Sequence, residues 1–561
     1  MGKLLVRSLV IGTAAIVGCS GTENSGGPVT SVGGSTQGGA DTSGGASATT
    51  VSLTGGASTV AIATGGTTAI AATGGKLATG GTTAIAATGG TMAATGGIPA
   101  TGGSKAVGGN APTGGAMPTG GSKAAGGSSA ATGGTSTVAG GNTATGGTTY
   151  TGTSACGAGT STSSDIVVNL ASLQQKITGF GVSSAWAGSY RNASDADYLW
   201  STTKGAGLTL LRIRYGDGLN IAKSAASMGA TVWLTPWGMG TNGAQGGPYT
   251  TQQTNPDGCT GSMPVLSDAE GWAKQLATWV ANAKTQGVPI FAVSAENEPD
   301  SCGINSTTSY SAAQLATWIP TLSAAMKPLG IKVMAPETMN RCGFDTYFKA
   351  IKASTAAWDA VDIFASHEYG CGTLTTDASI AAAGKEYWET EVDTGKGSGD
   401  STGDGITSAL LMATTMHNDL TKPNVNAWHL WWLYNASGNG GELYDTTTNV
   451  WTKRLWVLGN YSRYVRPGFK RVATTGTQPT NVFISAYTNP ADGQVSIVAI
   501  NTGTSAASVS LFITGAAPCS MTPYVTSATD SLTAQTAIAV SNSKFSASLA
   551  AQSATTFVGK P

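Results

Sequence analysis

The sequence predicts an α/β fold, a (β/α)8 TIM barrel with a C-terminal β-sandwich side domain, preceded by a disordered linker. The first part of the chain is mostly Gly, Thr, Ala and Ser, a central part alternates strand-like and helix-like segments, and the last part holds only short strand-like runs. Alternating units predict helices around a parallel sheet, whereas consecutive short strands predict a sandwich. We expect a signal peptide at 1–18, a linker at 19–160, the barrel at 161–466 and the sandwich at 467–561.

The N-terminus has the pattern of an export signal. Lys3 and Arg7 precede an apolar run at 9–17 that is too short for a stable membrane-spanning helix. Gly18 before Cys19 resembles the lipobox of bacterial lipoproteins, which implies cleavage before Cys19 and lipidation of its thiol. The next residue is serine, not the aspartate that favours retention at the inner membrane. We expect an outer-membrane or cell-surface lipoprotein, the lipid being its membrane contact, or a secreted protein with an ordinary signal peptide.

The linker is a low-complexity segment. The decamer Gly-Thr-Thr-Ala-Ile-Ala-Ala-Thr-Gly-Gly occurs at 66–75 and again at 81–90, and no aromatic residue precedes Tyr150. Such a segment buries too little apolar surface to offset its ordering entropy. We expect a flexible tether with an end-to-end distance of roughly 60–70 Å. A structural repeat of the cell wall is the alternative.

The central part contains eight alternating units. The segment at 266–286 illustrates the helical criterion, because Trp272, Leu276 and Val280 recur at helical spacing and Gly287 follows. The expected strands are at 177–186, 208–215, 231–237, 289–294, 331–336, 361–367, 386–390 and 425–433, and the expected helices at 195–207, 222–229, 266–286, 312–329, 344–358, a short Ala-rich segment before 386, 406–420 and 454–464. Eight units match a barrel, whereas a doubly wound sheet, the alternative, has no reason to stop at eight.

Short runs with Thr, Asn, Gly and Ser turns follow Pro467, as expected of a β-sandwich. Residues 165–175 are a candidate for an additional strand from before the barrel.

The charge balance and the absence of a glycine-rich motif disfavour two classes of function. The 29 basic residues balance the 29 acidic ones without a basic patch, so nucleic acid is not an expected partner. Gly179-Phe180-Gly181 lacks the third glycine and the downstream acid of a dinucleotide site. We expect no cofactor.

Six cysteines follow Cys19, an even number that is compatible with up to three disulfides in an exported chain. Cys259 and Cys302 fall in loops after predicted strands on the same face of the barrel, so we favour that pair first and Cys342 with Cys371 second. No cysteine has metal-ligand spacing, and the three histidines form no ligand cluster in the sequence. We therefore expect no metal site.

Two glutamates follow strand-like runs: Glu298, in the string 295–300 after the fourth strand, and Glu391, at the end of the seventh. In a (β/α)8 barrel the carboxyl ends of the strands meet at one face, where active sites lie. Cleavage of a glycosidic bond requires one carboxylic acid to protonate the leaving oxygen and one carboxylate to act at the sugar carbon. The pair therefore predicts a glycosidase with Glu298 and Glu391 as catalytic residues.

Glu296 and Glu389 are competing candidates, because each lies two residues before the favoured glutamate. Strand alternation places them on the same side of their strands but deeper in the barrel. The alternative interpretation is that Glu298 and Glu391 have no catalytic role and are ordinary carboxylates near helix N-termini. Their positions on two strands that open to one cleft favour the catalytic interpretation.

An ordered set of short strings across about residues 165–561 resembles glycoside hydrolase family 30. The strings are Ile177-Thr-Gly-Phe-Gly, Leu211-Arg-Ile-Arg, Thr235-Pro-Trp, Asn297-Glu-Pro, His367-Glu-Tyr, Trp388-Glu-Thr-Glu, Trp431-Trp and Arg466-Pro-Gly. Asn-Glu-Pro alone is a weak signal, whereas the ordered set is specific. The family belongs to a clan with its acids on strands four and seven, and a sandwich beside the barrel fits it.

The resemblance implies a retaining mechanism with Glu298 as the general acid/base and Glu391 as the nucleophile. Arg212 would lie beside Glu391 and keep it ionised, because an adjacent cation lowers the pKa of a carboxylate. The other implied substrate-binding residues are Asn297 on the sugar 2-hydroxyl, Tyr369 as a donor to Glu391, and the aromatic residues Trp186, Trp237 and Trp432. His367 either orients a neighbour or is a hydrogen-bonded histidine at a strand end.

The resemblance leaves the polysaccharide open. Glucuronoxylanases of the family carry an arginine just after the strand-eight tryptophans, whereas no Arg or Lys follows Trp432 until Lys453, so a glucuronate would lack a charge-assisted partner there. The loop after Trp237 also lacks the expected Pro-Pro-Ala-Trp pattern. We expect a monomeric endo-β-1,4-xylanase that acts on (glucurono)xylan without strict dependence on glucuronate. The alternatives are an endo-β-1,6-galactanase or other β-glycanase of the family, and a non-catalytic surface protein that binds polysaccharide.

Overall fold

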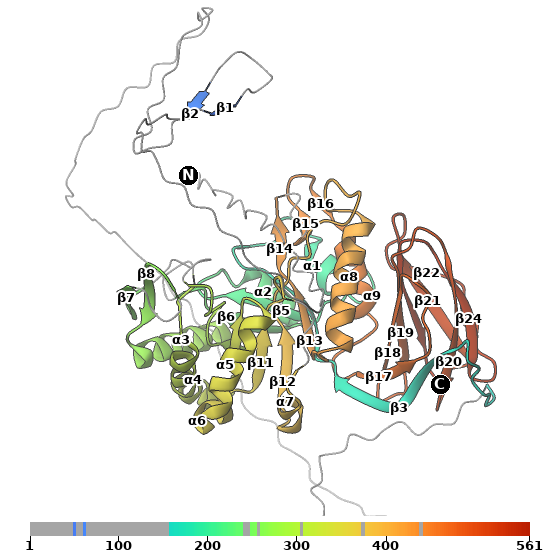
Figure 1. Cartoon of the computed structure of the whole chain (residues 1–561), viewed down its shortest axis with the longest axis horizontal. Helices are drawn as coiled ribbons and strands as arrows, with labels where there is room; N and C mark the ends of the chain where they lie inside the picture. Colours follow the sequence, from blue (N-terminus) through green and yellow to red (C-terminus); the bar gives the residue numbers. More distant parts are fainter. Residues whose placement is uncertain are drawn as a thin grey trace, which may run out of the picture. The chain divides into compact units, whose positions relative to one another are not determined.

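The computed structural model describes residues 49–51, 60–62, 156–238, 247–254, 259–302, 307–371, 376–436 and 441–561 (Figure 1). The predicted signal peptide, Cys19 and most of the predicted linker lie outside these residues. Within the linker, β1 (Thr49–Val51) and β2 (Val60–Ile62) pair antiparallel where we expected disorder. Their Thr, Val and Ile residues have high β propensity, which accounts for pairing in this short stretch. Among the described residues, no helix has both the length and the apolar character needed to span a membrane.

Eight parallel strands close into a barrel, as predicted. In chain order they are β4 (Gly179–Ser183), β5 (Leu210–Arg214), β6 (Thr231–Thr235), β9 (Ile290–Ser294), β10 (Lys332–Thr338), β11 (Ile363–Ser366), β12 (Glu386–Glu389) and β13 (Ala427–Leu430). Each strand pairs with the next, and β13 pairs with β4 to close the ring. A cluster that includes Trp233, Met334 and Trp388, contributed by the strands themselves, is fully buried, as in the packed interior of such barrels.

Helices follow the strands and pack their apolar sides on the barrel. They are α1 (Asp195–Trp200), α2 (Asn220–Ser227), α3 (Ala269–Thr285), α4 (Ala312–Met326) with the 3-10 turn η2 (Lys327–Leu329), α5 (Arg341–Ala353), α6 (Thr355–Ala360), α7 (Ala378–Ala382), α8 (Ile406–Thr421) and α9 (Lys453–Ser462). The single helix expected at 344–358 is two helices, because Ser354 ends α5 and its side chain caps α6 by accepting from the Ala357 N–H.

The eighth predicted strand, 425–433, is also divided. Its first part is β13 in the barrel, whereas β14 (Trp432–Asn435) belongs to a separate small sheet with β15 (Glu442–Asp445) and β16 (Val450–Trp451). A further hairpin, β7 (Thr250–Thr254) and β8 (Ser262–Leu266), lies between β6 and α3 in the chain. The break after Leu430 places the following tryptophans on backbone that no longer follows the barrel alternation.

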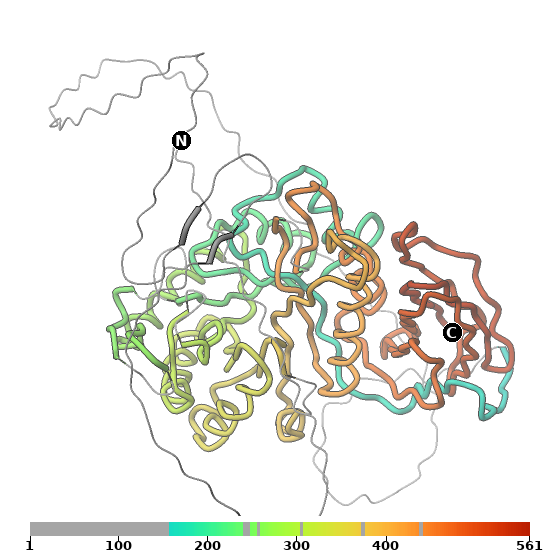
Figure 2. Tube along the Cα trace, turned by 45° about the horizontal axis from the view of Figure 1, so that its top comes forward, coloured from blue at the N-terminus to red at the C-terminus, as the bar shows by residue number. Residues whose placement is uncertain are grey.

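The C-terminal part is one ten-stranded sheet with its own buried apolar cluster. Its strands are β3 (Ile166–Lys176), β17 (Lys470–Thr475), β18 (Val482–Thr488), β19 (Val495–Asn501), β20 (Ala507–Thr514), β21 (Ser520–Thr526), β22 (Thr533–Ala534), β23 (Ile538–Ala539), β24 (Lys544–Leu549) and β25 (Ser553–Gly559). Strands from both ends of the sheet contribute to the cluster, so the sheet folds over a shared core as in a sandwich. In Figures 1 and 2 the turquoise β3, which precedes the barrel in the chain, runs along the red C-terminal strands.

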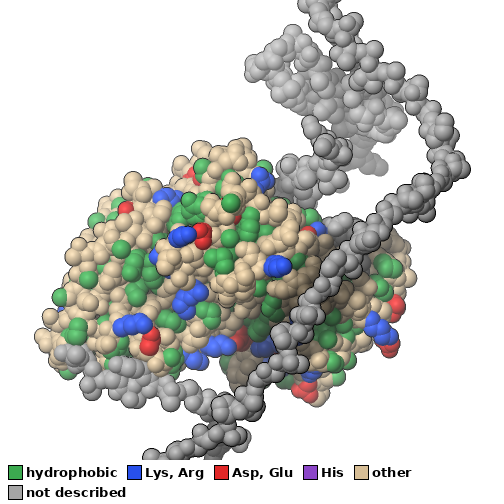
Figure 3. Space-filling view, turned by 180° about the vertical axis from the view of Figure 1, so that it is seen from behind, with side chains coloured by type: hydrophobic (Ala, Val, Ile, Leu, Met, Phe, Trp, Pro, Cys, Tyr) green, Lys and Arg blue, Asp and Glu red, His purple; other side chains and the backbone are tan. Residues whose placement is uncertain are grey.

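Three disulfides link the cysteines after Cys19. Cys259–Cys302 and Cys342–Cys371 confirm the two favoured pairs, and Cys156–Cys519 joins the segment before β3 to the residue before β21. On the face drawn in Figure 3 charged side chains are sparse, and blue Lys and Arg side chains are more frequent than red Asp and Glu ones, with several near its lower centre. Among the described residues, Trp186 is the most exposed of the large hydrophobic side chains, at 44%. Trp186 follows β4 and therefore lies at the carboxyl end of a barrel strand.

Candidate active site

The structure brings the two favoured glutamates together at the carboxyl ends of the fourth and seventh barrel strands. Glu298 follows β9 and Glu391 follows β12. A carboxylate oxygen of each, together with a ring nitrogen of His367, lies within 4.8 Å of the others. A separation of about 5 Å between two carboxylates is typical of glycosidases that form a covalent intermediate, because a larger gap would admit a water molecule.

Arg212, in β5, connects the carboxylates. It is fully buried, its Nη1 forms an ion pair with Glu391, and its Nη2 lies 2.7 Å from an oxygen of Glu337. The same Nη2 donates to Oδ1 of Asn297 at 2.7 Å, and the guanidinium lies 4.1 Å from the ring centre of Trp237. Four residues that the sequence analysis selected separately, each in or just after a different barrel strand (β5, β6, β9 and β12), are thus in one contact network.

His367, after β11, lies between three carboxylates. Its Nδ1 is 3.1 Å from Glu298 and 3.7 Å from Glu391, and its Nε2 is 3.4 Å from Glu337. Burial acts to lower the pKa of His367, but the nearby carboxylates outweigh burial and raise it to about 10. The raised pKa favours a positively charged histidine at neutral pH, in hydrogen-bond contact with Glu298.

The pKa of Glu391 differs from the expectation that Arg212 would lower it. Burial raises this pKa and is the largest effect, whereas His367 and Arg212 act to lower it and Glu298 raises it further. The net direction is upward, because complete desolvation outweighs the two adjacent cations. Tyr369 donates to Oε1 of Glu391 at 2.9 Å, as the resemblance implied, and so stabilises the ionised form.

Glu337, near the end of β10, is a site residue that sequence reasoning missed. It is fully buried, and Thr235 donates to it at 3.1 Å. Burial acts to raise the pKa of Glu337, but Arg212 and His367 outweigh burial and lower it. A signal was available, because Glu337 is a carboxylate at a strand end by the same criterion that selected Glu298.

Three residues at the site have a left-handed backbone. The φ angles are 45° for Glu298, 58° for Glu337 and 62° for Trp186. Residues other than glycine adopt this region at a cost of order 1–3 kcal/mol, and such residues cluster at active sites. The Glu298 N–H donates to the backbone oxygen of Glu337 at 3.0 Å, so the two strained turns hold each other.

The competing carboxylates lie outside the cluster. Oε1 of Glu296 accepts the backbone N–H groups of Gly238 and Asn297, both at 3.0 Å, and Glu389 accepts the backbone N–H of Glu391 at 2.8 Å. Burial raises the pKa of both Glu296 and Glu389 well above the ordinary range. These side chains support the backbone that carries the favoured glutamates.

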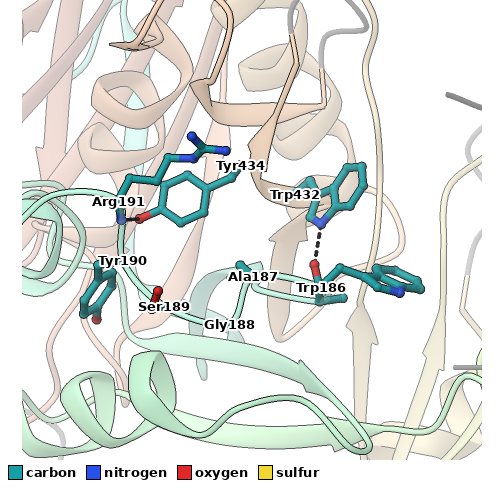
Figure 4. A pocket seen from close by; sticks show the side chains of 9 residues that line it. Trp186, Ala187, Gly188, Ser189, Tyr190, Arg191, Trp432 and Tyr434 are labelled. Atoms are coloured by element: carbon teal, nitrogen blue, oxygen red, sulfur yellow. Dashed lines mark hydrogen bonds between the residues drawn. The ribbon is translucent and has the colours of Figure 1, made fainter. Parts of the chain in front are cut away.

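Aromatic side chains extend from the cluster. Trp186 contacts both Trp237, at 5.4 Å between ring centres, and Trp432, at 6.0 Å. Trp431, which sequence reasoning did not select, lies closer to the cluster than Trp432, because its ring centre is 5.8 Å from the Arg212 guanidinium. Trp432 instead lines a pocket of about 330 Å³ with Trp186 and residues 187–191 (Figure 4).

The charges of the cluster suit acid/base chemistry. Glu298, Glu337 and Glu391 face two cations, Arg212 and the protonated His367. With one carboxyl protonated, the buried cluster is neutral, which leaves one acid and two carboxylates. Glu298, His367 and Glu391 are also the one set of described side chains whose ligand atoms converge enough to bind a metal ion. Arg212 already supplies a positive charge at this position.

His367 gives the fold a pH dependence. The pKa of this side chain is about 10 in the folded protein and about 6.5 when unfolded, so its charge stabilises the fold below about pH 6.5 and progressively less up to pH 10. We expect the unfolding free energy of the wild type to fall over that interval, and that of His367→Asn to fall less. Urea unfolding of both proteins at several pH values measures the difference. Parallel curves would show that His367 is not the titrating group.

Comparisons with known proteins find similar sequences and similar structures. No protein-family model matches the chain. Two curated relatives are the glucuronoxylanases XynC of Bacillus subtilis, one from strain 168 with 28% identity over 419 residues and one with 27% over 423. Each match covers 71% of this chain and 92% of the relative.

Solved structures are similar over the same share of the chain. A GH30 endoxylanase from Clostridium papyrosolvens C71 has 30% identity and a TM-score of 0.62, and the match covers 71% of this chain and all of that one. The family 30 subfamily 8 xylanase Xyn30A from Clostridium acetobutylicum has 28% identity, the same coverage and a TM-score of 0.62.

Proposed function

The chain belongs to glycoside hydrolase family 30 and is therefore a glycosidase, and we propose that it is a retaining endo-β-1,4-xylanase that acts on (glucurono)xylan. The observation that carries the proposal is the pair Glu298 and Glu391, whose oxygens lie within 4.8 Å of each other beside Arg212. The xylanases among its relatives, at 25–30% identity, support the choice of polymer.

In the first step, Glu298 donates its proton to the glycosidic oxygen while Glu391 attacks the anomeric carbon. His367 holds Glu298 in place through its Nδ1, at 3.1 Å. Arg212 and Tyr369 stabilise the negative charge of Glu391 until it is consumed in the covalent bond. Glu298 becomes a carboxylate as it gives up its proton, so the total charge of the cluster is unchanged when Glu391 forms its bond. In the transition state the negative charge that remains on Glu391 stabilises the developing positive charge on the sugar ring.

In the second step, Glu298 acts as a base and removes a proton from water, which attacks the glycosyl-enzyme and restores Glu391.

Asn297 is placed to bind the 2-hydroxyl of the sugar. Arg212 has only donors, so Oδ1 of Asn297 must face it, which leaves the amide nitrogen to donate to the 2-hydroxyl. Trp237 contributes an aromatic wall at this subsite, next to Arg212.

Export is part of the proposal. The basic residues and apolar run at the N-terminus, with Cys19 after Gly18, support secretion and lipidation. Three disulfides support an oxidising compartment. We propose an outer-membrane or cell-surface lipoprotein that acts as a monomer, whose segment 19–160 lets an anchored enzyme reach insoluble polymer. Globomycin treatment and metabolic labelling with a fatty acid test the lipid on Cys19, with Cys19→Ser as the unlabelled control.

Product analysis tests the activity. The chain is incubated with glucuronoxylan, arabinoxylan and β-1,6-galactan, and Glu391→Gln serves as the control. Oligomers released from xylan by the wild type alone are the expected result. Release from galactan alone would transfer the assignment to the galactanase alternative. Binding of the polymers without any product would favour the non-catalytic alternative.

Trp186 is expected to bind the polymer by stacking, since it is exposed and contacts Trp237 and Trp432. The Trp186→Ala variant should raise KM for xylan about two- to tenfold with a much smaller change in kcat, in line with about 0.5–1.5 kcal/mol for an aromatic contact. The control is Leu411→Ala, a substitution on α8 of a side chain that is 41% exposed. Equal KM values for the two variants would contradict the assignment.

A further inference from the structure

One of the disulfides lies two residues from a side chain of the catalytic cluster. Tyr369, in the loop after β11, donates to Oε1 of Glu391 at 2.9 Å. Cys371, two positions later, is bonded to Cys342 in the first turn of α5. Because α5 follows β10, the neighbour of β11 in the barrel, the bond connects the loops of two adjacent strands beside the active site.

The helix end of this cross-link is fixed by its surroundings. Arg341, which precedes the cysteine, is 1% exposed and forms ion pairs with Asp419 of α8 at 2.6 Å and with Glu368 at 3.4 Å. The side chain of Asn340 accepts a backbone N–H of the first turn at 2.9 Å and so caps the helix. A cross-link to such a fixed turn restrains whatever lies at its other end.

The loop end has fewer restraints of its own. The backbone N–H of Glu368 donates to the backbone oxygen of Glu391 at 3.1 Å, which holds the loop up to that point. Gly370, directly after Tyr369, has a left-handed backbone with φ 72°, and a β-carbon there would meet no described atom within 4 Å beyond its chain neighbours. Glycine has the largest conformational freedom of all residues. The place of Tyr369 therefore depends on the bond that holds the chain at Cys371.

We propose that the Cys342–Cys371 disulfide is a positioning device for catalysis, which holds the hydroxyl of Tyr369 on the nucleophile Glu391. The inference rests on the proposed function, since it takes Glu391 as the nucleophile. A hydrogen bond weakens steeply once its distance or angle leaves a narrow range, so a small displacement of the loop removes most of its effect. The two cysteines touch neither the substrate nor the reacting atoms and act through Tyr369.

A double-mutant cycle on xylan tests the coupling. Tyr369→Phe should lower kcat by about ten- to a hundredfold, as expected for loss of a hydrogen bond to a charged group, and Cys342→Ser/Cys371→Ser by about threefold or more with a smaller change in KM. Since both changes act on one hydrogen bond, the cysteine substitutions should cause no further loss in the Tyr369→Phe background. Losses that multiply would overturn the inference.

Cys156→Ser/Cys519→Ser is the matched control, because it removes a disulfide between the segment before β3 and the residue before β21. Removal of either disulfide lowers stability, so all assays are run below the lowest unfolding midpoint of the set. The control should keep the wild-type kcat. An equal loss of kcat in the two disulfide variants would assign both bonds a purely structural role and would overturn the positioning role.

The pH profile is a second reading that a structural role would not change. A donor to the ionised form of Glu391 favours that form, so its displacement should move the acid limb of kcat/KM to higher pH. Glu298, His367 and Arg212 also face Glu391 and are the same in every variant. The shift should appear in Tyr369→Phe and in Cys342→Ser/Cys371→Ser. An acid limb at the wild-type pH in the latter would contradict the proposal.

An NMR measurement without substrate separates failure of this inference from failure of the proposed function. Tyrosine labelled with ¹³C at Cζ gives a resonance for Tyr369, which is assigned by its loss in Tyr369→Phe. The resonance should shift in Cys342→Ser/Cys371→Ser and stay in place when the other disulfide is removed. An unmoved resonance would overturn the inference. Inactivity of the wild type on every xylan would defeat the proposed function, and the NMR comparison would still decide the role of the disulfide.

The wild-type chain provides the same test if the serine pair fails to fold. Cys342 is exposed, so a phosphine reductant reaches the bond in the folded protein. Mass spectrometry after alkylation reports the fraction of each disulfide that is open. Loss of activity and the shift of the Tyr369 resonance should both follow the opening of Cys342–Cys371. Full activity in a chain with that bond open would overturn the inference.

Discussion

Replacement of Glu391 by alanine should reduce kcat on xylan by about 10⁴-fold or more, as for other enzymes that lose a nucleophile. Among the described residues, the geometry places the buried carboxylate of Glu391 to attack the sugar while Glu298 protonates the leaving oxygen. Azide added to Glu391→Ala should occupy the vacated space and attack an aryl xylo-oligoside. The product expected is a glycosyl azide of inverted configuration, identified by NMR.

The same experiment assigns the partner. Glu298→Ala should keep the covalent step on substrates with a good leaving group, and azide should then yield a product of retained configuration. Glu389→Gln is the control for the competing carboxylate, because Glu389 binds the Glu391 backbone and not the substrate. Its smaller loss of activity should not respond to azide. A retained product from Glu391→Ala would exchange the two roles.

Much of the barrel could be predicted from the sequence, because each of its units carries its own local signal. A buried run such as β5 and a periodic helix such as α3 are identified without knowing their neighbours. Helix boundaries that depend on the hydrogen bond of one side chain were harder to predict from the sequence. Ser354 divides one expected helix because its hydroxyl caps the second one, and the same residue type would be tolerated inside a helix.

The candidate site was predictable where a residue stands at a strand end in a recognisable string, as Glu298, Glu391 and Arg212 do. Their mutual contacts follow from the closure of the barrel, which brings β5, β9 and β12 to one face. The net pKa direction of Glu391 was not predictable, because it depends on burial, which the sequence does not report.

Two residues were recognised only in the folded chain, although the strand-end position of Glu337 was a usable signal. Glu337 completes the charge balance of the cluster. It lies outside the short strings that carry the resemblance to the family. Arg191, which lines the pocket beside Trp432, reaches Tyr434 across most of the barrel sequence. Glu337 lies at a strand end and Arg191 lies in a loop, and the spatial neighbours of both are distant in the chain. Contacts of this kind cannot be predicted from a single sequence.

The second large effect is expected from Arg212→Met. Removal of this buried cation leaves Glu337 and Glu391 without their ion-pair partner in a desolvated site. Loss of one member of a buried ion pair costs about 3–5 kcal/mol, so the unfolding free energy at pH 7 should fall by about that amount. Activity should fall as well, because Glu391 can then avoid the penalty only by remaining protonated and non-nucleophilic.

The pH dependence and a double variant identify the cause. In Arg212→Met the pKa of Glu337 should rise from its lowered position, and the pKa of Glu391 should rise further above its unfolded value. Protonation of both groups then favours the variant's fold, so the loss of stability should shrink as the pH is lowered. Arg212→Met/Glu337→Gln removes one unpaired charge and should recover part of the stability but not the activity. Urea unfolding from pH 4.5 to 8 measures both effects, with Arg463→Met as a surface control. A loss that is the same at every pH would point to a packing defect, because a buried unpaired carboxylate must respond to protons.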